Sequence, residues 1–123
     1  MGFLDTFAKK LKQHRQDYTA RKAEEEIHVL AALSFARNNS NMSYDEVWAE
    51  INRILRRYNH FKIARFIRMH AIQQLILDVA LKKELSKSYI LECIINSTNF
   101  VVTGGNFSDV EKEEAMEIKA WLE

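Results

Sequence analysis

The sequence predicts an all-α protein, a single compact bundle of about six helices over residues 1–123. Three observations predict this class. The chain has no proline, and its three glycines stand near the ends, so nothing interrupts a helix between Phe3 and Thr103. Apolar side chains recur at helical spacing along most of the chain. Hydrophobic residues make up 47% of the 123 positions, enough for one core without disulfides or metals.

The first half of the chain predicts three helices. Residues 2–17 form a leading amphipathic helix, whose apolar face is Phe3, Leu4, Phe7 and Leu11. Glutamates open a second helix at 20–37, because carboxylates suit a helix N-terminus, and the polar stretch 38–41 ends it. A third helix spans 43–58. The predicted core stripes of the second and third helices are Ile27, Leu30, Ala31, Ser34 and Phe35, and Val47, Trp48, Ile51, Ile54 and Leu55.

The second half predicts three more helices after a corner at Asn59-His60. The segment 61–84 is so apolar that we expect it to be the central, most buried helix. Its apolar residues are Ile63, Phe66, Ile67, Ile72, Leu75, Ile76, Val79 and Leu81. A fifth helix spans 86–102, and a sixth runs from Ser108 to the end of the chain.

Two helix starts carry the same capping pattern. Ser43 and Glu46, and again Ser108 and Glu111, have the spacing of a capping box, in which each side chain accepts from the other residue's backbone N–H. The glycines before the second box, at 104–105, are expected to take positive φ and end the fifth helix. The recurrence predicts two related helix–turn–helix units around the central helix.

The second turn and its weaker earlier copy resemble the tellurite-resistance TerB family. Its members carry an Asp-Gly-x-apolar-x-x-x-Glu-Lys turn in each half of a helical domain, which Gly105-Asn106-Phe107 and Glu111-Lys112 match. The opening MGFLDTFAKKLKQ resembles the family's leading helix, and the resemblance covers about 24–55 and 90–120. It implies a single TerB-like domain over 1–123, from a bacterial or phage stress or defence system.

The resemblance also implies a divalent-cation site, but this chain lacks part of it. Gly104 replaces the leading Asp of the second turn, and Asn39-Ser40 replaces Asp-Gly in the first. Asp109 and Glu111 remain as candidate ligands, although caps and helix dipoles also account for them. A calcium loop of the EF-hand type would need carboxylates at alternating positions, which this turn does not have.

No catalytic pattern is present, so we expect a protein that is not an enzyme and binds no organic cofactor. The sequence has no nucleophile–base signature and no phosphate-binding glycine loop. The spacing of Glu25 and His28 is half of a di-iron motif, but the second half is missing. Cys93 is the only cysteine and lies among apolar residues, which favours a buried thiol and a reducing cytoplasm.

The strongest sign of a binding surface is residues 53–70, which carry six basic residues and no acidic one. Arginine dominates, and its planar guanidinium suits bidentate recognition of carboxylates or phosphates. These residues are the predicted partner-binding set: Arg53, Arg56, Arg57, Lys62, Arg65 and Arg68.

Three functions remain open for this sequence. The first is a non-catalytic cytoplasmic module that binds a protein partner through the arginine-rich surface. The second is a nucleic-acid-binding protein that uses the same side chains against phosphates. The third is a stress protein that binds a divalent cation, or that lies on a membrane through its leading helix. Alternatively, the arginines are solvated or pair with the acidic sixth helix, through Glu111, Glu113, Glu114, Glu117 and Glu123.

Overall fold

The computed structural model describes residues 20–123, and the predicted leading helix at 2–17 lies outside them. The described part consists of five α-helices and one 3₁₀ turn and has no strand, which confirms the all-α prediction for these residues. The elements are α2 (Ala20–Arg37), α3 (Tyr44–Leu55), η1 (Arg56–Tyr58), α4 (Lys62–Ala80), α5 (Lys87–Thr103) and α6 (Asp109–Leu122).

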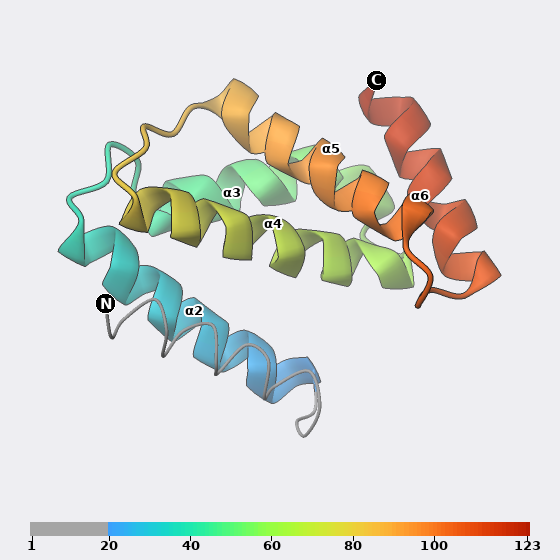
Figure 1. Cartoon of the computed structure of the whole chain (residues 1–123), viewed down its shortest axis with the longest axis horizontal. Coiled ribbons are helices and arrows are strands. Elements are labelled where there is room, and N and C mark those ends of the chain that lie inside the picture. Colours follow the sequence, from blue (N-terminus) through green and yellow to red (C-terminus); the bar gives the residue numbers. More distant parts are fainter. Residues whose placement is uncertain (1–19) are drawn as a thin grey trace.

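The central position predicted for α4 is confirmed. In Figure 1, α2 lies along one side of α4 and α5 along the other, with α3 behind and α6 beside α5. All four of these helices contact α4. Its fully buried large side chains are Ile63, Ile67, Ile72, Leu75 and Ile76. No helix within residues 20–123 is long and apolar enough to cross a membrane.

The core stripes of α2 and α3 also lie where the periodicity predicts them. Ile27, Ala31, Ser34 and Phe35 of α2 are buried, while Leu30 is only partly buried. On α3 the buried apolar residues are Val47, Ile51, Ile54 and Leu55, and Trp48 is partly buried and packs against the core.

Both predicted capping boxes form. The Ser43 hydroxyl accepts from Glu46 N at 3.1 Å, and the Glu46 carboxylate accepts from Ser43 N at 3.4 Å. At α6 the Ser108 hydroxyl accepts from Glu111 N at 3.2 Å, and the Glu111 carboxylate accepts from Ser108 N at 2.9 Å. Such caps satisfy backbone donors that the first turn leaves open.

The predicted end of the central helix is wrong by four residues, because α4 ends at Ala80 rather than at 84. Lys82 takes a left-handed conformation, with φ 62°. Its N–H then reaches Val79 O at 2.9 Å, and Lys83 N reaches Asp78 O at 3.0 Å. This pair of bonds is a Schellman motif, which usually has glycine at the left-handed position. Leu81 consequently lies past the helix and is exposed rather than buried.

The expectation that Gly104 and Gly105 take positive φ is also wrong. No described glycine has positive φ, and Gly104 has φ −75° and ψ 145°. The reason for glycine at 104 is a close approach. A Cβ there would lie 2.8 Å from Phe100 O and 2.9 Å from the Phe107 ring, whereas a Cβ at Gly105 would meet nothing within 4 Å.

One side chain joins two loops that are far apart in the sequence. The Asn41 amide, between α2 and α3, donates to Leu85 O at 2.7 Å. Its carbonyl accepts from Leu85 N at 2.9 Å, so both backbone groups of Leu85 are satisfied by one side chain. Leu85 itself is buried, which makes these two bonds the anchor of the α4–α5 connection.

Gly104→Ala is expected to lower the free energy of unfolding by about 1–3 kcal/mol, because the new methyl group would press on a backbone oxygen that cannot move aside. Gly105→Ala is the matched control and is expected to be neutral or stabilising by up to about 1 kcal/mol. Urea unfolding monitored by circular dichroism measures both. Equal effects of the two substitutions would contradict the close approach at Gly104.

Candidate functional site

The predicted basic surface is divided in two by the corner at Asn59-His60. Arg53, on α3, borders a groove between α3, α5 and α6, which we call the Trp121 groove. Arg65 and Arg68, on α4, border a second pocket between α2, α3 and α4, which we call the Arg68 pocket. The six predicted residues therefore do not form one continuous site.

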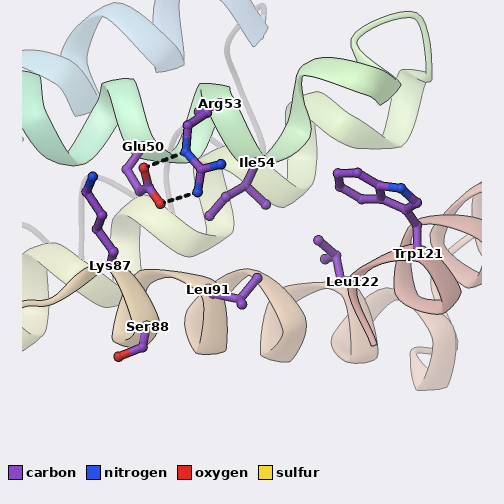
Figure 2. Close-up of a pocket in the computed structure, with 8 residues that line it drawn as sticks. All are labelled: Glu50, Arg53, Ile54, Lys87, Ser88, Leu91, Trp121 and Leu122. Atoms are coloured by element: carbon purple, nitrogen blue, oxygen red, sulfur yellow. Dashed lines mark hydrogen bonds and ion pairs between the residues drawn. The ribbon is translucent and has the colours of Figure 1, made fainter.

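The Trp121 groove combines an apolar wall with a charged end. It has a volume of about 380 Å³. Figure 2 shows Glu50, Arg53 and Lys87 near one end and Trp121 at the other. The apolar side chains between them and beside Trp121 are Ile54, Leu91 and Leu122. Ser88 adds a hydroxyl on α5.

A bidentate ion pair forms the charged end. Arg53 donates from Nε to Glu50 Oε1 at 2.8 Å and from Nη2 to Oε2 at 2.7 Å. Glu50 is only 6% exposed, while the Arg53 side chain is 68% exposed. The hydrogen bond from Arg53 lowers the pKa of Glu50 and outweighs the opposing effect of burial. With Lys87 on the other side of Glu50, this end has two cations and one carboxylate (Figure 2).

Trp121 is held in place by two contacts from η1. The Arg57 guanidinium carbon lies 5.6 Å from the indole ring centroid, a cation–π distance. The Tyr58 ring meets the indole edge-to-face, with 5.7 Å between centroids. Trp121 nevertheless remains 45% exposed. A search of the sequence for basic clusters misses it, because its place beside Arg57 arises only when α6 packs back on the bundle.

The Arg68 pocket, of about 410 Å³, is more polar. Arg65 pairs with Glu24 of α2, and Arg68 donates to the side-chain carbonyl of Asn59. Arg68 is half-buried, and this burial lowers its pKa although the charge of Glu24 opposes the change. The remaining walls are Trp48, Asn52 and Met69.

The alternative that the arginines pair with the acidic sixth helix is wrong for Arg53 and Arg65. Their partners within residues 20–123 are Glu50 and Glu24. Two α6 carboxylates accept hydrogen bonds from backbone N–H groups instead. Glu114 accepts from Ile63 N at 3.4 Å, and Glu111 accepts from Ser108 N in the capping box of α6. Arg56 and Lys62 are exposed.

The candidate cation ligands are not gathered into a site. Asp109 and Glu111 both lie in the first turn of α6, where Glu111 is used by the capping box. No three His, Cys, Asp or Glu side chains within the described part of the chain come together as metal ligands. His28 of the half di-iron motif instead contacts the Tyr44 hydroxyl and the edge of Trp48, at 4.8 Å between ring centroids. Burial lowers the pKa of His28, which favours the neutral ring.

Cys93 is buried near a polar cluster around the buried Asp78, which the sequence did not reveal. The Asp78 carboxylate accepts from the Tyr89 hydroxyl, and Lys83 Nζ lies 3.3 Å from it. Burial, with the nearby charge of Asp78, raises the pKa of the Cys93 thiol to about 11. The thiol is therefore protonated at neutral pH and is a poor nucleophile. The cluster joins the end of α4 to the start of α5.

Arg53→Met is expected to destabilise the protein at about pH 7, because it leaves the buried Glu50 carboxylate without its partner. The folded protein holds the pKa of Glu50 below its unfolded value, so this contribution is present above about pH 4.5 and disappears as pH falls through the folded pKa. Urea unfolding of both proteins at several pH values checks the expectation. Arg56→Met is the matched control, and a difference that did not shrink in acid would contradict the role of Glu50.

Comparison with known proteins identifies no relative. No family model matches the chain, and neither a curated protein nor a solved structure does. The resemblance to the TerB family therefore stays a prediction from the two turns.

Proposed function

We propose that this protein is a non-catalytic cytoplasmic module that binds another protein, and that the Trp121 groove receives a segment of the partner with an acidic residue beside apolar ones. The observation that carries this proposal is a half-exposed tryptophan and an exposed, oriented arginine in one groove. Tryptophan and arginine are the residues that most often dominate the binding energy of protein interfaces.

The charges of the groove favour an acidic partner. Arg53 and Lys87 flank a single carboxylate, so a positive charge is left over for a group from outside. The Arg53 fork is already oriented by Glu50, so less conformational entropy is lost when it donates its remaining N–H groups. A carboxylate in the partner would complete this end of the groove.

The other half of the groove supports an apolar anchor next to that carboxylate. Ile54 is buried, Leu91 and Leu122 are partly buried, and Trp121 presents one side of its ring. Covering such surface stabilises a complex by about 25 cal/mol per Å² of apolar area. A side chain that fills this space would also keep water from the ion pair, which strengthens the electrostatic contact.

The nucleic-acid function is the second candidate. Arg56, Arg57 and Lys62 are exposed and could contact phosphates. The observations favour it less, because Arg53 and Arg65 each face a carboxylate and Arg68 is half-buried. Few charges are then left to release counterions, which is the main source of affinity for nucleic acids.

The resemblance to the TerB family suggests the biological setting of this module. It implies a bacterial or phage stress or defence system and binding of a divalent cation. Association with a membrane surface is a separate candidate, which rests on the amphipathic pattern of residues 2–17. The duplication belongs to the same proposal. In each half of the chain, a helix that contributes to the core is followed by a short polar turn and then by a helix that begins with a capping box. These pairs are α2 with α3 and α5 with α6, and their similarity supports an origin from two related units.

Selection from a displayed peptide library is expected to recover peptides with an acidic residue within one helical turn of a large apolar residue. Trp121→Ala should weaken the selected peptides by roughly 10- to 100-fold, because truncating an interface tryptophan removes most of its contact area. Lys87→Glu should weaken them by charge repulsion. Fluorescence anisotropy of labelled peptides measures each dissociation constant.

Two matched variants control this experiment. Met116→Ala removes another exposed apolar side chain of α6, and Lys62→Glu reverses a charge outside the groove. Both should bind the peptides as the wild type does. Peptides without an acidic residue, or full affinity in Trp121→Ala, would overturn the proposed occupant of the groove.

Oligonucleotide binding separates the two candidate functions. If the protein binds protein partners, its affinity for single- and double-stranded oligonucleotides should be weak between about 50 and 200 mM salt. Removing two arginines, in Arg56→Ala with Arg65→Ala, should then change nothing measurable. Tight binding that falls steeply with salt, and a shallower slope in the double variant, would favour the nucleic-acid function.

A further inference from the structure

Within residues 20–123, the walls of the Arg68 pocket carry more positive than negative charge. Two guanidinium groups, of Arg65 and Arg68, face one carboxylate, Glu24. Arg65 holds that carboxylate, so Arg68 is left with the neutral side chain of Asn59 as its hydrogen-bond acceptor. In the described part of the chain, Arg65 and Arg68 thus share the charge of Glu24, so one of the two positive charges has no carboxylate of its own.

An unused donor marks the same side chain. The Nε atom of Arg68 is buried and has no hydrogen-bond partner within residues 20–123. Buried donors are nearly always paired, because an unpaired one forfeits the hydrogen bond it made with water. An acceptor from outside the protein, bound in the pocket that Arg68 lines, could satisfy this N–H if the guanidinium changed its orientation on binding.

We propose that the Arg68 pocket binds a phosphate monoester of a small molecule, with the phosphate on Arg65 and Arg68. A phosphate has several oxygens, so it can accept from both guanidinium groups at once. The amide nitrogens of Asn52 and Asn59 are further donors at the walls. Arginine matches this geometry through its planar fork of N–H groups.

The size and remaining walls of the pocket indicate an ester rather than the free ion. Its volume of about 410 Å³ lies within the range of small-molecule sites and leaves space beyond a single phosphate group. That space is bordered by Trp48 and Met69, an indole ring and a thioether that suit an apolar or aromatic body. Free phosphate would satisfy the arginines but leave these two walls uncovered.

Glu24 has a defined role in this proposal. It pairs with Arg65, and its side chain is 25% exposed, so it can turn to solvent when a phosphate takes its place. The carboxylate and the ligand then compete for the same guanidinium. Removing the charge of Glu24 should therefore strengthen phosphate binding. If Glu24 had only a structural role, its removal would not strengthen binding.

Fluorescence of Trp48 tests the proposal with two defined probes, inorganic phosphate and phenyl phosphate. The protein has two tryptophans, so the titration uses Trp121→Phe as its background. Phenyl phosphate is expected to bind more tightly than inorganic phosphate, because its ring covers Trp48 and Met69. Arg68→Met should weaken it by about 10- to 100-fold through loss of charged hydrogen bonds.

Three further variants keep the result interpretable. Arg68→Lys keeps the charge but loses the planar fork, and should bind more weakly than the background protein. Glu24→Gln should bind phenyl phosphate several-fold more tightly, and Arg56→Met, outside the pocket, should bind it unchanged. Equal affinity for both probes would assign the site to free phosphate and overturn the ester.

Two results would overturn the site as a whole. One is the absence of a Trp48 response at millimolar phenyl phosphate in both the background protein and Glu24→Gln. The other is binding that persists unchanged in Arg68→Met and Arg68→Lys. Neither result bears on the Trp121 groove, which shares no residue with this pocket.

Discussion

The constraint on which this structure depends is the width of the apolar face of α4. Ile63, Ile67, Ile72, Leu75 and Ile76 are all fully buried, and they project over an arc too broad for one neighbouring helix to cover. Four helices therefore pack against α4, and each covers part of its apolar face with an apolar stripe of its own. The Trp121 groove lies where α3 meets α5 and α6, and the Arg68 pocket lies where α2 meets α3 and α4, so both hollows follow lines along which helices meet.

This arrangement explains why charged residues gather beside apolar ones at both hollows. A seam between two helices exposes the flanks of their apolar stripes, and the next residues around each helix are polar. At one seam the result is an oriented arginine near a tryptophan, and at the other it is a pair of arginines near a tryptophan. Cations beside apolar side chains are therefore the feature on which both proposed binding sites rest.

The sequence predicts those features that short stretches of chain determine. The capping boxes at Ser43 and Ser108 and the core stripes of α2 and α3 depend on residues within a few positions of each other, and they form as expected. The end of α4 was missed because a lysine takes the left-handed position where glycine is usual. Gly104 was misinterpreted for a related reason, since its neighbour Phe107 packs back on the helix end.

The candidate sites were predictable only in part. The basic run at 53–70 contains the arginines that line the two hollows, but Glu24, Lys87 and Trp121 come from other helices and carry no local signal. The division of the run into two surfaces is likewise a result of packing, because the corner before α4 turns consecutive residues toward different neighbours.

The two hydrogen bonds between Asn41 and Leu85 have a consequence for how the molecule comes apart. They join positions 44 residues distant in the chain, as a reversible crosslink would. The turn after α2 therefore cannot open without also freeing the segment that leads into α5. If this end of the bundle opens locally, both halves of the chain lose structure together. The two bonds therefore favour unfolding as one cooperative unit over stepwise opening.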